Sequence, residues 1–348
     1  MALPNHFRRW LRFCALVGWW GFIGSTFIGA TLSFASDHYP TAEAEIDWYI
    51  PPENTTQPVV AELVAPGESS PETWRQPPSQ LPQTSPFLGP VETPPVVNLH
   101  RVEGRFETLS GGELGMDSVD GSATLQFAEL DQFSISPRAG VMFVDGPTRT
   151  DLPARLYSGQ VEFRWFQDWE PFFLDLAVIP GLFTDGDATG SQAFRLQGRA
   201  VGYLAFSEET QVALGATYLD RDDVPLLPIV GLIHSPREDI RIEAMFPRPR
   251  LLKRIAEDSA GETWAYLQGE LGGGSWAIER PGRWGRNRID IASYRDYRLI
   301  AGIERRVTEG GSALLEAGYV FGRELTYESG RGDYDPEGTF LIRCGLTH

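Results

Sequence analysis

The sequence predicts an all-β protein, a transmembrane antiparallel β-barrel of about 12 strands over residues 100–348. Three observations favour this fold. Apolar and polar residues alternate with a period of two in segments separated by turn residues, several of these segments are long, and aromatic residues lie near their ends. A signal peptide (residues 1–35) and a disordered, acidic, Pro-rich linker (residues 36–99) are expected to precede the barrel.

The N-terminal segment has the features of an export signal. Arg8, Arg9 and Arg12 precede an apolar run that begins at Phe13, and small residues at Ser33 and Ala35 suit cleavage before residue 36. An uncleaved membrane anchor is the alternative, because the apolar run is long. Cleavage would remove one of the chain's two cysteines and leave Cys344.

The next segment cannot bury enough apolar surface to fold. Between Pro40 and Pro95 lie 13 of the chain's 26 prolines, and residues 36–99 carry nine acidic residues against one basic residue, Arg75. Such a composition predicts an extended, mobile spacer.

The remaining residues alternate in the manner of strands with one apolar face. Val161, Phe163 and Trp165 alternate with Glu162 and Arg164, for example. A soluble β-sandwich gives the same pattern with its apolar face inward, whereas a transmembrane barrel turns that face toward lipid. Several segments exceed the usual length of soluble strands and match the ~9–11 residues needed to cross a bilayer at a tilt. The longest are Leu156–Gln167, Ser191–Phe206 and Ser312–Thr326. Aromatic residues near segment ends, as in interfacial girdles, include Trp165, Trp169, Phe206, Trp264, Tyr294, Tyr297, Tyr319 and Tyr327. Together these features favour the barrel over a secreted β-sandwich.

In a barrel, the polar residues of these segments face the lumen. The candidate lumen-facing charged network is Glu162, Arg164, Asp175, Arg195, Arg199, Arg241, Glu243, Asp290, Glu304, Glu316 and Arg343. It could line a channel that sorts solutes, or it could fill a small barrel with arginine–carboxylate pairs. Pairing is favoured, because both signs occur in similar number and an unpaired charge in a narrow interior is costly. We therefore expect a constricted lumen with little selectivity between cations and anions.

Composition and motifs argue against several other functions. The 47 acidic and 30 basic residues give a net charge of −17, which argues against nucleic-acid binding. Gly272-Gly273-Gly274 is followed by an alternating segment and therefore indicates a bent strand and not a phosphate loop. His234 and Ser235 are adjacent in a strand and point to opposite faces, so they cannot form a catalytic pair. Asp220, Asp222 and Asp223 could hold calcium but more often form a solvated loop.

Four segments within residues 225–348 have distinctive sequences: Phe246–Arg250, Gly269–Gly274 with Trp276, Ser293–Arg298 and Glu316–Glu324. Together they resemble an uncharacterised family of bacterial outer-membrane barrels. The final alternating run also resembles the C-terminal targeting strand of such barrels, although His348 stands where an aromatic residue is usual. The resemblance implies only the fold and a location in the outer membrane. In that location we expect outer-membrane lipid and the barrel-assembly machinery as partners. It implies no catalytic residue, and the oligomeric state stays open.

The function expected is a structural role or the passive transport of small solutes, without catalysis, cofactor or metal. Three alternatives remain open. One is surface binding through acidic loops at Asp185–Thr189, Asp220–Asp223 and Gly330–Asp335. The others are a lipid-acting outer-membrane hydrolase and a secreted β-sandwich protein.

Overall fold

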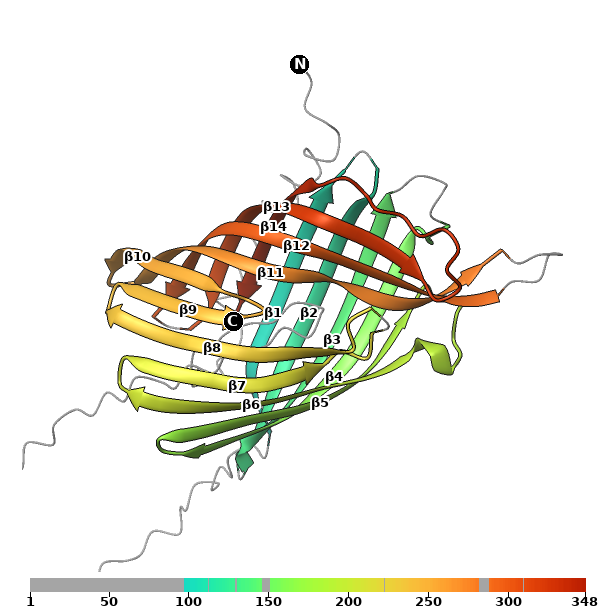
Figure 1. Ribbon diagram of the computed structural model, residues 1–348. Coiled ribbons are helices and arrows are strands. Elements are labelled where there is room, and N and C mark those ends of the chain that lie inside the picture. The colour runs from blue at the N-terminus through green and yellow to red at the C-terminus, as the bar shows by residue number, and fades with distance from the viewer. Residues whose placement is uncertain are drawn as a thin grey trace, which may run out of the picture. The chain divides into compact units, whose positions relative to one another are not determined.

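The structure, a computed structural model, shows a closed antiparallel β-barrel (Figure 1). It describes residues 97–348 except 112, 129, 146–150, 222, 282–287 and 309. Consecutive strands are neighbours around the ring, and β1 closes it by pairing with β14. The strands are β1 (Val97–Ser110), β2 (Gly115–Phe127), β3 (Leu130–Asp145), β4 (Arg155–Trp169), β5 (Phe172–Thr184), β6 (Phe194–Ser207), β7 (Thr210–Tyr218), β8 (Leu226–Arg237), β9 (Ile240–Phe246), β10 (Arg250–Asp258), β11 (Gly261–Arg280), β12 (Arg288–Val307), β13 (Ser312–Tyr327) and β14 (Thr339–Thr347). One 3₁₀ turn, η2 (Ser191–Ala193), precedes β6.

The barrel fold is confirmed, but the expected number of strands is wrong, because the ring has 14 strands and not about 12. Two features of the sequence hide strands. In β2 the acidic residues Asp117 and Asp120 and the small residues between them leave little apolar alternation. The strands β9 and β10 are short and are separated only by Pro247-Arg248-Pro249, which allows them to be counted as one interrupted segment. The prolines do end β9, as expected for residues that cannot donate to a ladder.

The predicted signal peptide (1–35) and most of the predicted linker (36–99) lie outside the described residues. Within the described part no helix is long and apolar enough to cross a membrane.

The outer surface of the barrel is apolar. Leu196, Leu214 and Leu299 point outward and are 46%, 70% and 61% exposed, whereas Gln197, beside Leu196, is 9% exposed. The same alternation runs around the ring and leaves large apolar side chains exposed on the strands. A soluble β-sandwich would bury this face, so the closed ring with an apolar exterior makes the sandwich alternative wrong.

The two ends of the barrel differ in their connections. At the end that holds the C-terminus, adjacent strands are joined by short turns, such as the one between Trp169 of β4 and Phe172 of β5. Most connections at the opposite end are longer, such as those between β5 and β6 and between β13 and β14, although the one between β9 and β10 is short. This asymmetry is typical of outer-membrane barrels.

The barrel is closed by fewer strands at the end with the long loops, because β11 pairs there with β5. The β9–β10 hairpin is short, and β10 pairs with β11 only as far as Arg250 opposite Gln268. Farther along, β11 instead meets β5 across the barrel, with Ala277 opposite Thr184. The backbone N–H of Asp185 donates to the carbonyl of Ala277 at 3.1 Å and strengthens this contact. The strands β6 to β10 therefore widen only the other end of the barrel.

The glycine run of β11 forms part of this closure. Gly273 has a φ of +118°, and a Cβ atom there would lie 1.9 Å from the carbonyl oxygen of Tyr294. Only glycine fits this backbone, and the run lies within strand β11, as the sequence indicates, and not in a phosphate loop.

Two apolar clusters fill parts of the interior. One lies in the narrow closure and draws its strand residues from β1, β2, β4, β5 and β11–β14, with Trp276, Tyr294 and Leu325 among its members. The other lines the inner face of β5–β9 and includes Phe173, Tyr203 and Met245.

Candidate functional site: the charged lumen

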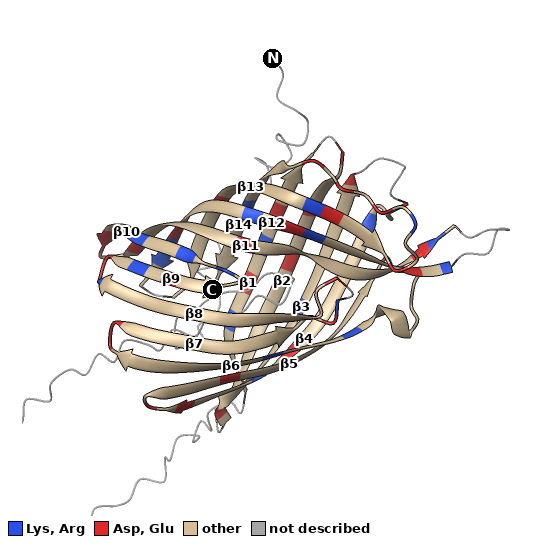
Figure 2. Ribbon diagram, viewed as in Figure 1, with Lys and Arg blue, Asp and Glu red and all other residues tan. Residues whose placement is uncertain are grey.

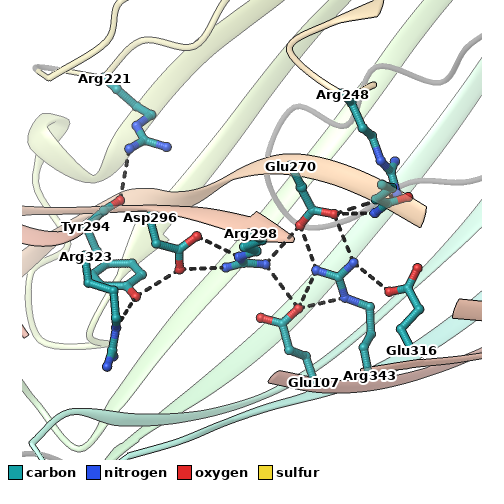
Figure 3. Close-up of polar contacts among 11 residues, drawn as sticks. Glu107, Arg221, Arg248, Glu270, Tyr294, Asp296, Arg298, Glu316, Arg323 and Arg343 are labelled. Atoms are coloured by element: carbon teal, nitrogen blue, oxygen red, sulfur yellow. Dashed lines mark hydrogen bonds and ion pairs between the residues drawn. The ribbon is translucent and has the colours of Figure 1, made fainter. Parts of the chain in front are cut away.

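The lumen contains a network of ion pairs whose central residue is Arg343 of β14 (Figure 3). Its Nη2 atom lies 2.7 Å from a carboxylate oxygen of Glu107 and 2.7 Å from one of Glu270. Its Nη1 atom lies 2.9 Å from Glu316. Arg343 is 1% exposed, so these three carboxylates replace water around its guanidinium group.

Arg298 of β12 extends the network. Its Nη1 atom lies 3.2 Å from Glu107 and 3.0 Å from Glu270, and its Nε atom lies 2.7 Å from Asp296. Arg248, from the turn between β9 and β10, approaches Glu270 at 3.8 Å. Figure 3 shows Arg248 and Arg343 on two sides of the Glu270 carboxylate.

The network continues toward the loop end through a tyrosine. The hydroxyl of Tyr294 donates to Asp296 at 2.9 Å, and Nε of Arg323 donates to that hydroxyl at 2.8 Å. The chain of contacts thus joins β1, β11, β12, β13 and β14 along the inner wall.

Glycines on the inner face make room for these side chains. A Cβ atom at Gly272 would lie 2.2 Å from Oδ1 of Asp296 and 2.3 Å from Nε of Arg298. A Cβ atom at Gly302 would lie 2.4 Å from Cζ of Tyr266. The Tyr266 ring therefore lies over Gly302, and its hydroxyl donates to Glu316 at 2.5 Å.

A second group of ion pairs lies on the other side of the lumen. Asp175 of β5 is fully buried and accepts from Arg164 of β4 at 3.0 Å and 3.2 Å. Arg199 of β6 approaches Asp175 at 3.3 Å and Glu162 of β4 at 3.2 Å. Two arginines thus share two carboxylates across three adjacent strands.

The remaining predicted residues lie in smaller groups. Arg241 contacts Glu243 at 2.8 Å within β9, and Glu304 contacts Arg306 at 3.1 Å within β12. Asp290 lies at the loop end, 2.9 Å from Arg280. Arg195 faces inward, but its one described hydrogen bond, at 3.3 Å, goes to the backbone carbonyl of Asp220.

The candidate network from the sequence lacks Glu107, Glu270, Asp296 and Arg298, which contact one another or Arg343, and also the more distant Arg248 and Arg323. A usable signal exists for two of them, because Asp296 and Arg298 alternate with outward-facing Tyr297 and Leu299. Glu107 lies on the same face of β1 as Glu103 and Arg105. Few apolar residues alternate with these three, so the pattern is weak. Glu270 precedes the glycine run, and because glycines have no side chains, the sequence there does not show which residues of β11 face the lumen.

The charges of the interior nearly balance. Among the described buried residues are eight acids (Glu107, Asp120, Asp175, Glu243, Asp290, Asp296, Glu304 and Glu316) and seven arginines (Arg101, Arg195, Arg199, Arg221, Arg250, Arg323 and Arg343). Figure 2 shows both signs mixed along the strands. The described buried residues therefore carry no large excess of either sign.

The other candidate motifs contact neighbouring residues of the barrel. The ring of His234 lies 3.0 Å from the hydroxyl of Thr210. Asp223 pairs with Arg221 at 2.8 Å, while Asp220 accepts from the backbone N–H of Leu196 at 2.8 Å; Asp222 lies outside the described residues. The described part contains no group of three or more histidine, cysteine or acidic residues placed to hold a metal ion.

Comparison with known proteins gives weak structural likenesses. No protein-family model matches the chain, and no curated protein does either. The KdgM porin is 10% identical with a TM-score of 0.34, over 71% of this chain and 98% of the porin. The NanC porin is 8% identical with a TM-score of 0.35, over 70% of this chain and 98% of the porin. An outer membrane channel from Pseudomonas putida F1 is 13% identical with a TM-score of 0.34, over 75% of this chain and 98% of the channel. Because these identities and TM-scores are low, the fold is assigned from the strand pairing of this chain and not from the likenesses.

Proposed function

We propose that this chain is an outer-membrane β-barrel that gives small solutes a narrow passive route and has no catalytic role. The observation that carries the proposal is the reversed polarity of the barrel. Apolar side chains such as Leu214 and Leu299 cover the outside, whereas Asp175, Glu316 and Arg343 are buried inside. Lipid around the barrel and a polar interior account for both faces at once.

The exported state and the envelope location belong to the same proposal. The signal peptide at residues 1–35 would take the chain out of the cytoplasm, and the barrel-assembly machinery would insert it. Lipid of the outer membrane would then contact the apolar belt.

The interior supports a narrow route and not a wide pore. The Arg343 network occupies the lumen side of five strands, and the Asp175 group occupies three more. Because their opposite charges are paired, a solute meets little net field and is sorted by size more than by sign.

Two experiments test this proposal. For location, cells expressing the full chain are fractionated, and the membrane fraction is run on gels with and without heating in detergent. An outer-membrane barrel is extracted only by detergent and changes mobility on heating, whereas a soluble protein without heat-dependent mobility would refute the proposal.

For transport, the purified barrel is reconstituted in liposomes, and swelling is measured with neutral solutes of increasing size. We expect slow swelling with the smallest solutes and none with larger ones. Liposomes that behave like protein-free liposomes with every solute would refute passive passage while leaving the barrel itself intact.

A further inference from the structure

The end of the barrel with the long loops is filled by apolar side chains. Because β5 meets β11 directly there, nine strands, β1–β5 and β11–β14, surround that end. Side chains from eight of these strands form one apolar cluster whose members are no more than 7% exposed, and Met142 and Val144 of β3 pack against it. A polar solute in this core would lose its hydrogen bonds to water and find few replacements. The core therefore blocks the axis of the barrel at this end.

The wall beside this core lacks a continuous strand ladder. The strand β10 pairs with β11 only up to Gln268, and β5 meets β11 at Ala277, so the part between them is in a ladder with β12 alone (Figure 1). Across the gap, the first four residues of β6 and of β8 pair on one side only. We call this gap the side notch, and its edges are Phe194–Gln197, Leu226–Ile229 and Leu271–Trp276.

Side chains, and not strands, close the side notch. Arg221, in the connection between β7 and β8, donates to the backbone carbonyl of Tyr294 in β12 at 2.9 Å (Figure 3). It also donates to the two oxygens of Asp223, at 3.0 Å and 2.8 Å. Asp220 accepts at 2.8 Å from the backbone N–H of Leu196, on the unpaired edge of β6. These two residues thus connect β6 to β12 past the glycine run of β11.

The contacts leave a small space within the side notch. A cavity of about 20 Å³ is lined by Asp220 and Arg221 and, on β11, by Gly273 and Gly274. That volume has room for about one water molecule, so the notch is shut in this conformation. Because the two glycines have no side chains, the guanidinium group of Arg221 is what spans the notch to β12. The notch opens when Arg221 leaves the carbonyl of Tyr294.

Outward-facing residues place the side notch at the membrane–water interface. Tyr297, opposite Leu271, and Tyr218, at the end of β7, are 46% and 45% exposed, as in an interfacial girdle. Farther along the same strands, Arg295 of β12 and Glu324 of β13 form an ion pair on the outer face, which belongs outside the hydrocarbon layer. Water can therefore hydrate the unpaired backbone at the notch, whereas a strand edge in lipid would stay unsatisfied.

We propose that small polar solutes leave the lumen sideways through this notch, at the level of the membrane interface, and that Arg221 is the gate. The inference rests on the proposed passive function and specifies its path. Solutes enter at the end where 14 strands form the ring, and the apolar core blocks the axis at the other end. The side notch is the break in the wall beside that core.

A second arginine supplies the matched control. Arg280, at the end of β11, has its guanidinium carbon 4.0 Å from the ring centroid of Tyr327, a member of the apolar core. It donates to Asp290 at 2.9 Å and to the backbone carbonyl of Arg331 at 2.7 Å. Arg280 thus holds the β13–β14 connection at the apolar end, as Arg221 holds the notch. Removing one arginine loosens the side exit, and removing the other loosens the end.

Liposomes containing the purified full-length barrel or one variant are tested for swelling with neutral sugars of increasing size. We expect Arg221→Ser to raise the swelling rate about threefold or more and to admit larger sugars, because the width of a constriction and its lining control passage. Arg280→Ser should swell like the unmodified barrel. Heat-dependent gel mobility shows that each variant is folded.

A blocking experiment complements this opening experiment. Both native cysteines are first changed to serine (Cys14→Ser and Cys344→Ser). A bulky maleimide is then attached in detergent to Pro225→Cys beside the notch, or to Arg331→Cys at the apolar end, both of which are exposed positions. Labelling at position 225 should abolish swelling after reconstitution, and labelling at position 331 should leave it unchanged.

Equal swelling by the unmodified barrel and a folded Arg221→Ser variant, above the rate of protein-free liposomes, would overturn the side exit and leave passive passage intact. Faster swelling with Arg280→Ser alone would overturn it in favour of an axial route, as would undiminished swelling of the labelled Pro225→Cys variant. If liposomes with every variant, Arg221→Ser included, behave like protein-free liposomes, passive passage itself is refuted and this path with it.

Discussion

Arg343 of β14 and Glu270 of β11 meet at 2.7 Å although β12 and β13 lie between their strands in the ring. The contact therefore reaches across the curved inner wall and not along one ladder. The long side chain of Arg343 spans the gap between the strands and also pairs with Glu107 and Glu316. In a lumen of this kind, opposite charges fill space that water would fill in an open pore.

Removing the central arginine should destabilise the barrel strongly. Arg343→Gln leaves Glu107, Glu270 and Glu316 with less compensating charge, and breaking a buried pair typically costs about 3–5 kcal/mol. Urea unfolding in lipid vesicles measures the free energy. The double variant Arg343→Gln with Glu270→Gln should lose less than the sum of the two single variants. Strict additivity would show that the two side chains do not interact.

The inward and outward faces could be predicted largely from the sequence. Glu316 and Arg343 were placed inside because each alternates with apolar neighbours such as Leu315 and Ile342, and the structure buries both charged residues. Their partners depend on how the sheet closes. Period-two alternation assigns a residue to a face, but it does not determine which nonadjacent strands approach each other.

The number of strands and the narrow closure could not be predicted from the sequence either, because both depend on which distant strands pair. A single bridge between Ala277 and Thr184 brings β11 to β5, and no local pattern in either strand predicts it. The positive φ of Gly273 allows the close backbone approach, but a glycine run in a strand is compatible with many bends.

The apolar exterior predicts a cost for a charge that a soluble surface would tolerate. Leu214 in β7 is 70% exposed, so Leu214→Arg on a soluble protein should change stability by no more than about 0.5 kcal/mol. In a bilayer, an arginine near the midplane costs about 2–4 kcal/mol. Urea unfolding in vesicles should show this loss for Leu214→Arg and a smaller one for the control Leu214→Ala. Equal midpoints for Leu214→Arg and the unmodified barrel would contradict a lipid-facing β7.

Replacing a glycine of the inner face with alanine should destabilise the barrel only where the added methyl group meets another side chain. Gly272→Ala places a Cβ atom 2.2 Å from Asp296 and 2.3 Å from Arg298, so the ion pair must shift. Overpacking of this kind costs about 1–3 kcal/mol. The matched control is Gly104→Ala in β1, where nothing lies within 4 Å of the added atom. If both variants unfold at the same urea concentration, the Asp296–Arg298 pair does not occupy the space in front of Gly272.

The central claim is that paired charges leave a constricted lumen without a preference for either sign of ion. Planar-bilayer recording of the purified barrel tests it most directly, with a salt gradient across the membrane to give the reversal potential. We predict only small conductance steps and a reversal potential near zero. A large, stable conductance with a clear preference for cations or for anions would contradict the paired lumen and show an open, selective pore.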